Sequence, residues 1–174
     1  LPTRAGSKIN RDAPPASRDA VLIERLTQVD AILLGGLNMG EYAYDFTGEN
    51  AHDGPCRNPH DLARMAGGSS SGSGAATAAG LAPLSLGSDT NGSIRVPSSF
   101  CGVFGLKPTY GRISCFGGVP GTGAYSTNHF GVLTRTVKDC ALVLQEIAGY
   151  DPKDPLSAAE PTAYPFVSAF VVLP

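Results

Sequence analysis

The sequence lacks a charge excess, has no tryptophan and contains no long apolar run. Its 174 residues include 13 Lys and Arg against 15 Asp and Glu, a formal net charge of −2. A nearly neutral chain offers no electrostatic footprint for nucleic acid or for an anionic membrane surface. No apolar stretch reaches transmembrane length, and no secretory pattern opens the chain. We therefore expect no direct nucleic-acid partner and no membrane partner.

Cysteine and histidine are scarce. None of the four cysteines lies in a Cys-x-x-Cys motif, which favours free thiols in a reducing cytosol and hence a cytoplasmic location. They are Cys56, Cys101, Cys115 and Cys140. His52 and His60 flank Cys56 at a spacing compatible with metal binding, but the Gly and Pro residues between them indicate turns. We expect neither a metal site nor another cofactor.

Small residues are abundant, and they cluster. Gly67 and Gly68 precede three serines, a composition that by itself fits a flexible linker equally well. Residues 75–79 are Ala or Thr and favour a closely packed helix that ends at Gly80. A linker would not lead directly into a buried helix, so we interpret the serines as part of a folded site.

A second polar cluster follows a short apolar segment. Residues 83–88 alternate as a buried strand does, and residues 89–97 then form a turn that contains Ser93. Backbone N–H groups can converge in front of a serine on such a turn and form an oxyanion hole. Alternatively, Ser93 caps a helix. Local spacing is compatible with both interpretations.

Apolar periodicity and turn residues suggest alternating helices and strands. They predict helices over 18–29 and 38–44, strands over 31–34 and 103–106, an irregular loop over 47–66, and a helix opened by a Thr136–Asp139 capping box and ended at Gly149. The Asp-Pro-Lys-Asp-Pro run after Tyr150 indicates a linker. This alternation implies α/β layers around a mixed or parallel sheet.

The motifs GGSSSGSGAA and LGSDTNGSIRVPSSFCGVFGLKPTYGRIS, preceded by LPTRAGS, LNMGEYAY and RNPHD, resemble the amidase signature family of amide hydrolases. The resemblance extends from Leu1 to about Pro155. It implies an α/β amidase-signature fold, a mixed β-sheet core covered by helices, present here as an N-terminal-side fragment. We expect residues 1–155 to be a partial amidase signature domain and residues 156–174 to be a linker and an apolar strand of the same fold.

The resemblance also implies a Ser-Ser-Lys mechanism. Ser93 matches the nucleophile that forms the acyl-enzyme. Ser69 matches the serine that follows a cis peptide bond and relays the proton. The backbone amides of the turn match the oxyanion hole, namely those of Thr90, Asn91, Gly92 and Ser93. More weakly, Ala43 and Tyr44 match part of the substrate pocket.

The lysine of this mechanism is expected a few residues upstream of Leu1, because Lys8 and Lys107 do not match its position. We therefore expect the chain alone to hydrolyse amides very poorly. The resemblance implies a small linear amide as substrate, with carboxybiuret as one candidate, and self-association or a small partner subunit. Two alternatives stay open: an amidotransferase subunit that releases ammonia for a partner, and an inactive fragment or scaffold.

A rival interpretation takes Gly68–Gly72 as the Gly-x-Ser-x-Gly nucleophile elbow, with Ser70 as nucleophile and His129 as its base. An elbow requires a preceding strand, and residues 61–66 lack the β-branched and aromatic residues typical of one. The chain also departs from the family pattern at residues 127–129, where Thr-Asn-His replaces a Ser-Leu-Asp-like stretch. His129 is thus either a substrate contact or, as we favour, a loop residue.

Overall fold

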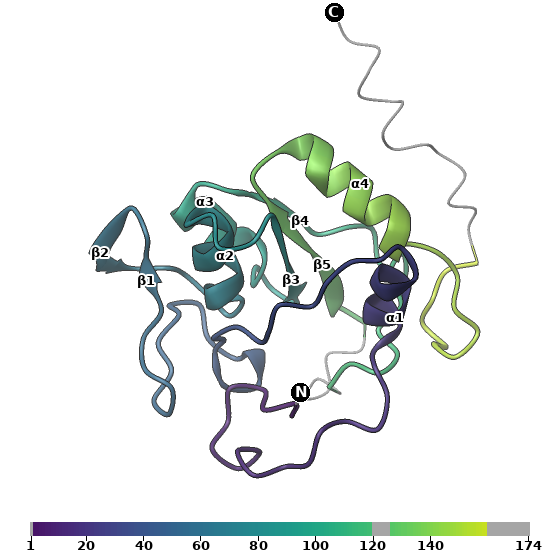
Figure 1. The fold of residues 1–174 in the computed structure, drawn as a ribbon, viewed down its shortest axis with the longest axis horizontal. Helices are drawn as coiled ribbons and strands as arrows, with labels where there is room; N and C mark the ends of the chain where they lie inside the picture. Colours follow the sequence, from purple (N-terminus) through teal and green to yellow (C-terminus); the bar gives the residue numbers. More distant parts are fainter. Residues whose placement is uncertain (1, 120–125, 160–174) are drawn as a thin grey trace, which may run out of the picture.

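The computed structural model describes residues 2–119 and 126–159, and these form an α/β structure in which helices cover a three-stranded sheet (Figure 1). The expected fold class is confirmed. In chain order the elements are α1 (Val21–Gln28), the 3-10 helix η1 (Glu41–Ala43), β1 (Arg57–Asn58), β2 (Asp61–Met65), α2 (Ser71–Ala78), β3 (Leu84–Asp89), α3 (Arg95–Cys101), β4 (Phe104–Leu106), β5 (His129–Thr134) and α4 (Val137–Ile147).

The sheet has the strand order β3-β5-β4, and both of its pairings are antiparallel. Because side chains alternate along a strand, β5 contributes to both faces of the sheet. Val132 packs with Cys140 and Val143 of α4 in the main apolar cluster, which Leu22 of α1 also joins. Helices α4 and α1 therefore cover one face of the sheet.

The opposite face is covered by α2 and the start of α3. Leu133 is fully buried there, and it lies near Gly87 of β3 together with Ser70 and Ile94. A Cβ atom at Gly87 would lie 2.8 Å from the Ser70 hydroxyl oxygen and 3.1 Å from an Ile94 carbon. Glycine at this position thus lets two loop segments approach the same strand, and both of these segments belong to the predicted site.

Helix α2 is joined to β3 by a ladder of hydroxyl groups. Ser73 donates to the carbonyl of Leu86 at 2.7 Å, and the hydroxyls of Thr77 and Ser85 lie 2.7 Å apart. These groups are buried, so each contact satisfies a polar atom that would otherwise be costly. The serine-rich composition of α2 thus serves packing against β3, and the prediction of a closely packed helix ending near Gly80 is confirmed.

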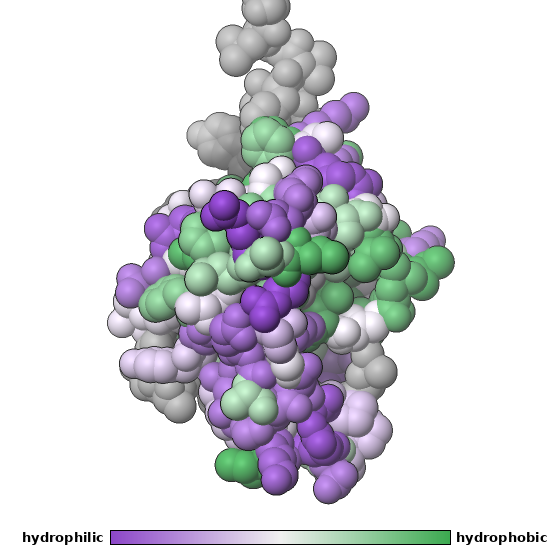
Figure 2. Space-filling view, turned by 90° about the vertical axis from the view of Figure 1, so that its left-hand side faces the viewer, coloured by the Kyte–Doolittle hydropathy of each residue, from purple (hydrophilic) through white to green (hydrophobic). Residues whose placement is uncertain are grey.

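The loop expected over 47–66 instead contains the hairpin β1–β2. All five residues of β2 are exposed, which explains why the sequence shows no apolar alternation there. Leu62 and Met65 remain exposed on the hairpin and Phe100 on α3. Figure 2, which views the molecule from this side, shows such hydrophobic residues among mostly hydrophilic ones.

Two other sequence expectations were wrong. Residues 31–34 form no strand, and Ile32 is 84% exposed there. This apolar run therefore pairs with no strand within the described part of the chain. Residues after Tyr150 are packed rather than a free linker, because Asp151 accepts a hydrogen bond from Ser114 and Asp154 accepts one from the Cys115 N–H. The apolar strand expected within residues 156–174, over 166–174, lies outside the described residues.

The local helix signals otherwise agree with the structure. Helix α1 is shorter than expected, the short helix near residue 41 is present as η1, and β4 lies within the predicted range. Thr136 caps α4 by accepting from the Asp139 N–H at 3.1 Å. Among the helices of the described residues, none has the length and apolar character needed to cross a bilayer.

Candidate active site

Ser69 lies at the end of the loop that leads into α2. The Gly68–Ser69 peptide bond is cis, as the resemblance implied. The Ser69 side chain is 1% exposed, and its hydroxyl oxygen has no hydrogen-bond partner among the described residues. A buried hydroxyl without a partner is unusual, because leaving such a group unsatisfied is unfavourable. Among the described residues, Ser69 shares this state only with side-chain atoms of Arg4 and Asn38.

The loop before Ser69 is held by residues on both sides of η1. The N–H of Gly68 donates to the carbonyl of Phe46, and the N–H of Gly40 donates to the carbonyl of Ser69. Asp45 turns this segment by accepting from the N–H groups of Thr47 and Gly48. A Cβ atom at Gly68 would lie only 2.7 Å from the Asp45 carboxylate, so glycine is required at this close approach.

Ser93 lies on a turn that the side chain of Asp89 organises. Asp89 is fully buried at the end of β3, and its carboxylate accepts from the N–H groups of Gly92 at 2.8 Å and Ile94 at 3.1 Å. It also receives two hydrogen bonds from the Arg95 guanidinium. Burial alone would raise the pKa of Asp89, but hydrogen bonds from Arg95 and the backbone outweigh burial, and the pKa is lowered.

The helix-cap alternative for Ser93 is therefore wrong. Ile94, not Ser93, is the N-cap residue of α3, and no side chain of the cap residue makes the capping bond. The carboxylate of Asp89 fills this role instead. The Ser93 hydroxyl has no hydrogen-bond partner within residues 2–119 and 126–159, and the side chain remains 4% exposed.

The structure brings the two serine loops together. The N–H of Ser70 donates to the carbonyl of Ser93 at 3.2 Å, so Ser69 and Ser93 lie on adjacent backbone segments. Both segments lie against Gly87 of β3. The hydrogen bonds between α2 and β3 fix the position of one segment relative to the other. Residues far apart in sequence thus form one hydroxyl-bearing site.

A cleft of about 1060 Å³ opens in front of this site. Most of the expected site residues line it, including Ala43, Tyr44, Thr90, Asn91 and Ser93. Within the described part of the chain, the N–H groups of the last three have no hydrogen-bond acceptor. They are therefore available to a bound group, as an oxyanion hole requires.

Gly92 departs from the expectation. Its N–H was expected to point at the oxyanion, but it donates to the buried Asp89 carboxylate instead. Gly92 has a φ of 130°, a conformation that favours glycine, and it does not line the cleft. Its contribution is to the shape of the turn.

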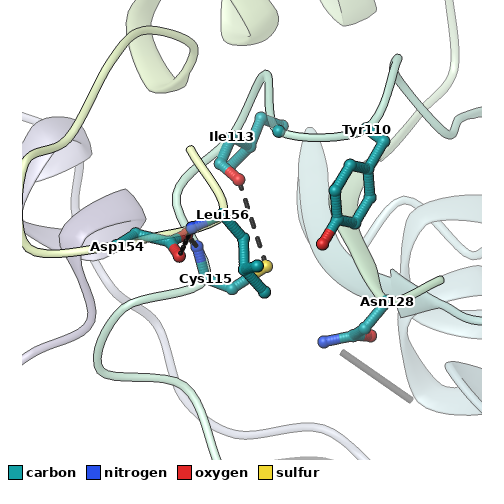
Figure 3. A pocket seen from close by; sticks show the side chains of 7 residues that line it. Tyr110, Ile113, Cys115, Asn128, Asp154 and Leu156 are labelled. Carbon is teal, nitrogen blue, oxygen red and sulfur yellow. Dashed lines mark hydrogen bonds between the residues drawn. The ribbon is translucent and has the colours of Figure 1, made fainter. Parts of the chain in front are cut away.

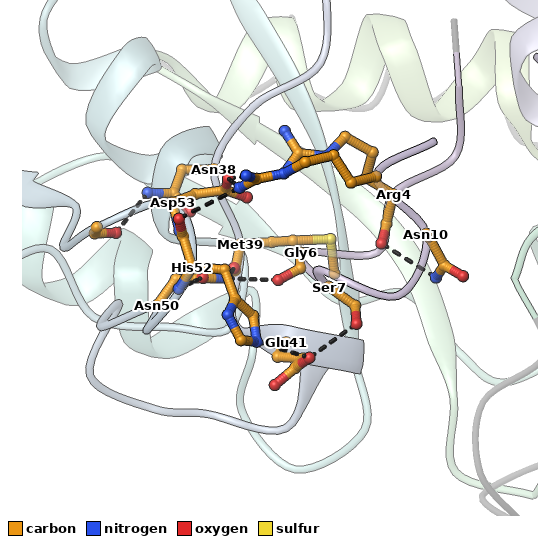
Figure 4. Close-up of polar contacts among 12 residues, drawn as sticks. Arg4, Gly6, Ser7, Asn10, Asn38, Met39, Glu41, Asn50, His52 and Asp53 are labelled. Carbon is orange, nitrogen blue, oxygen red and sulfur yellow. Dashed lines mark hydrogen bonds and ion pairs between the residues drawn. The ribbon is translucent and has the colours of Figure 1, made fainter. Parts of the chain in front are cut away.

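The pocket residues Ala43 and Tyr44 lie at the end of η1, whose Glu41 is bonded to the N-terminal segment (Figure 4). Glu41 accepts from the Ser7 hydroxyl at 2.7 Å and lies 3.1 Å from Nε2 of His52. Tyr44 is 89% exposed, and its neighbour Ala43 has a φ of 62°. The turn thus presents two side chains to the cleft while its acidic residue is held by the N-terminal segment.

The elbow interpretation does not fit the structure. Although a strand, β2, does precede Gly68, it belongs to the separate hairpin and not to the main sheet. The Ser70 hydroxyl lies 3.3 Å from both the N–H and the carbonyl of Ser88, so it faces β3. His129 contacts the carbonyls of Asp89 and Thr127 rather than a serine.

The histidines and cysteines do not converge. His60 bonds to the carbonyl of Cys101, whereas His52 contacts Glu41, and all four cysteines are free. In the ranges that the structure describes, no group of three His, Cys, Asp or Glu side chains could hold a metal ion.

Two residues near the site were not singled out by the sequence analysis. Asp89 shapes the Ser93 turn by accepting from the Gly92 N–H. Its position three residues before Gly92 could have predicted this role, since Asp commonly bonds to the backbone of a following turn. Asn128 lines both the main cleft and a small cavity of about 40 Å³ beside Tyr110 and Cys115 (Figure 3). Only the long-range pairing of β3 with β5 places it there.

Comparisons with known proteins identify the family of this chain. The model of the family described as Amidase matches residues 1–171. The chain is 62% identical over 153 residues to AtzE, the 1-carboxybiuret hydrolase subunit of Pseudomonas sp. (strain ADP), covering 88% of this chain and 33% of that protein. It is 50% identical over 161 residues to a glutamyl-tRNA(Gln) amidotransferase subunit of Anaeromyxobacter sp. (strain K), covering 92% and 32%.

Among solved structures, an inhibitor-bound complex of an s-triazine catabolic enzyme superposes with a TM-score of 0.92 at 57% identity. That match covers 97% of this chain and 36% of the solved one. The chain thus spans about a third of the length of the curated relatives it matches. With a family model that matches nearly every residue, the chain belongs to the amidase family.

Proposed function

We propose that this chain carries the serine pair of an amide hydrolase, with Ser93 as nucleophile and Ser69 as proton relay. The observation that carries the proposal is a partnerless, buried Ser69 hydroxyl on a segment that is bonded to the segment of Ser93, a residue that lines the cleft. A relay serine needs free lone pairs and a free proton to pass a proton between two groups. Ser69 alone among the clustered serines of its loop is in that state, since Ser70 and Ser71 bond to backbone carbonyls.

In the first step, the Ser93 oxygen attacks the amide carbon while its proton moves to Ser69, and the Ser69 proton moves on to a base. The N–H groups of Thr90, Asn91 and Ser93 stabilise the oxyanion, and losing one such donor typically costs about 3 kcal/mol. The C–N bond then breaks, the nitrogen leaves with a proton returned through Ser69, and an ester remains on Ser93. Water cleaves this ester and restores the serine.

The base is a lysine in this proposal, and it belongs to a segment outside residues 1–174. Lys107 donates to the carbonyl of Pro108, Lys153 pairs with Glu24, and Lys8 and Lys138 are exposed. None of them contacts the Ser69 hydroxyl. Residues 1–155 then form part of one amidase signature domain.

The substrate that we favour is a small linear amide resembling carboxybiuret. We place the protein in the cytoplasm and expect it to self-associate or to bind a small partner subunit. The 62% identity to a carboxybiuret hydrolase subunit supports this choice. The 50% identity to an amidotransferase subunit supports one alternative, release of ammonia for a partner chain. In this alternative the nitrogen passes to the partner chain instead of to solvent.

A fluorophosphonate reagent followed by peptide mapping tests the nucleophile. It is applied to the 174-residue chain and, in parallel, to a longer form that extends upstream of Leu1. We expect Ser93 to be labelled in the longer form, and Ser93→Ala to abolish both labelling and amide hydrolysis.

Ser98→Ala is the matched control for this experiment. Ser98 is as buried as Ser93, but its hydroxyl donates within α3 to the carbonyl of Ile94 at 2.8 Å. We expect Ser98→Ala to retain labelling at Ser93. Labelling at Ser70, or an absence of labelling at any serine in the longer form, would show that the proposed chemistry is wrong.

A further inference from the structure

We propose that Asn128 determines which amides this site accepts, by donating a hydrogen bond to a second carbonyl oxygen of the substrate, close to the carbonyl that Ser93 attacks. This inference rests on the proposed function, since it takes Ser93 as the attacking group. The substrate class that follows is amides with a second carbonyl near the scissile one.

The position of Asn128 is fixed by the register of the sheet. Asp89, the last residue of β3, pairs with His129, the first residue of β5, in an antiparallel ladder. One step beyond this pair, Asn128 lies opposite Thr90, the first residue of the Ser93 turn. The sheet therefore places Asn128 beside the turn without depending on the conformation of a long loop.

His129 faces away from the cleft and holds the end of the strand. Its Nδ1 lies 3.2 Å from the carbonyl oxygen of Asp89 and 2.6 Å from that of Thr127. Because both are acceptors, Nδ1 carries the proton. The ring also packs edge-on against Tyr110, with centroids 5.6 Å apart. His129 does not line the cleft, whereas Asn128 does, so the residue of this stretch that can meet a substrate is Asn128.

The amide of Asn128 is oriented by Thr90. The Thr90 hydroxyl donates to Oδ1 of Asn128 at 3.4 Å. With Oδ1 occupied, the Nδ2 group presents its N–H donors, for which the described residues provide no acceptor. Figure 3 shows Asn128 beside the small cavity that adjoins the cleft. An amide donor held in this way suits a carbonyl or carboxylate oxygen.

The charged residues that line the cleft are of both signs, namely Arg18, Asp19 and Asp45. The carboxylate of Asp45 accepts from Thr47 and Gly48, and that of Asp89 accepts from Arg95 and the turn. Charge alone therefore selects no particular substrate, and the uncharged Asn128 amide is the donor that meets a second carbonyl oxygen.

Acetoacetamide and butyramide test the inference, because they differ only in the second carbonyl oxygen. Binding of both compounds is measured by calorimetry in the Ser93→Ala background, which makes the result independent of turnover and of the proposed nucleophile. We expect Asn128→Ala to weaken acetoacetamide binding about tenfold, the effect of removing one hydrogen bond, and to change butyramide binding by less than about twofold.

Asn128→Asp separates recognition from positioning. Aspartate keeps an acceptor for Thr90 but replaces the Nδ2 donors with an anionic oxygen, so we expect acetoacetamide binding to fall at least as far as in Asn128→Ala. Recovery of binding in Asn128→Asp, or equal losses for both compounds in Asn128→Ala, would overturn the proposal and leave Asn128 as a support of the turn. Failure of Ser93 labelling would instead overturn the proposed function alone.

Discussion

At the scale of single residues, Ser69 and Ser70 are sequence neighbours with opposite surroundings. The Ser69 hydroxyl is buried without a partner in the described structure, whereas the Ser70 hydroxyl bonds to the backbone of Ser88. Chemical roles follow from these environments, because a hydroxyl already bonded to a strand is not available to relay a proton. The pattern Gly-Ser-Ser-Ser-Gly alone is compatible with either serine as the functional one.

We expect Ser69→Ala to lower amide hydrolysis by about 10²- to 10⁴-fold, the usual range for losing a group that transfers a proton. Ser70→Ala is the comparison, and it should lower activity by less than about tenfold while reducing stability. Both are measured as kcat/KM on a form of the protein that turns over an amide, together with the rate of fluorophosphonate labelling. A larger loss of labelling in Ser70→Ala than in Ser69→Ala would contradict the assignment.

Residues whose role depends on contacts distant in sequence were harder to predict. Ser69 and Ser93 were predicted because their motifs match a known family. Asp89 and Asn128 were not, because their importance depends on which N–H groups and which strand lie near them. The expected donor Gly92 shows the same limitation, since only the structure reveals that its N–H is already bonded to Asp89.

At the scale of elements, the contact between α2 and β3 sets the relative position of the two serine loops. Helix α2 begins two residues after Ser69, and β3 ends four residues before Ser93. The hydroxyls of Thr77 and Ser85 bond to each other, and both residues are buried. This pair forms one end of the hydrogen-bond ladder between α2 and β3. Its loss should weaken the element contact without touching the cleft.

We expect Thr77→Val to lower the free energy of unfolding by about 1 to 3 kcal/mol, because the shape is kept but the Ser85 hydroxyl loses its partner. The double variant Thr77→Val with Ser85→Ala should be less destabilised than the sum of the single variants, since no unsatisfied hydroxyl remains. Urea unfolding measures all three. Strict additivity of the two changes would show that the hydroxyls are not coupled.

The elements that sequence could predict are those with local signals. The capping box of α4 and the glycine after α2 agree with the structure. The hairpin over residues 57–65 was missed because β2 is exposed along its whole length, and β5 because its partners are distant in sequence. The apolar run at 31–34 predicted a strand, but apolar character alone does not supply a pairing partner.

At the scale of the whole molecule, three carboxylates stabilise the arrangement of the chain. Each one either joins segments that are far apart in sequence or shapes a loop of the candidate site. They are Asp45 in the loop beside Ser69, Asp89 in the Ser93 turn and Asp151 after α4. Burial alone would raise the pKa of each, but hydrogen bonds outweigh burial and the pKa values are lowered, with side-chain bonds from Thr47, Arg95 and Ser114 respectively.

A lowered pKa in the folded state gives a definite direction to the pH dependence of stability. Each carboxylate stabilises the fold fully above its unfolded pKa of about 4, and this contribution is lost as the pH falls through the folded pKa. The free energy of unfolding should therefore be nearly constant at neutral pH with respect to these groups and fall below about pH 4.

Asp89→Asn tests how much of this acid sensitivity comes from the Ser93 turn. At pH 7 we expect it to lower the free energy of unfolding by about 3 kcal/mol, because the Arg95 charge loses its partner and an amide N–H faces backbone donors. Arg95 is more than half exposed on its side chain, which places the effect at the low end of the range for buried pairs. At pH values below the lowered pKa of Asp89, where its carboxyl is protonated, the difference from the unchanged protein should shrink.

Urea unfolding at a series of pH values measures both curves, and Asp61→Asn provides the control. Asp61 also pairs with an arginine, Arg64, but on the exposed hairpin, which does not line the cleft. We expect its curve to follow that of the unchanged protein within about 0.5 kcal/mol at every pH. If Asp89→Asn showed the same small effect, the turn would be held by its backbone alone, and the alignment of Ser93 with the cleft would need another cause.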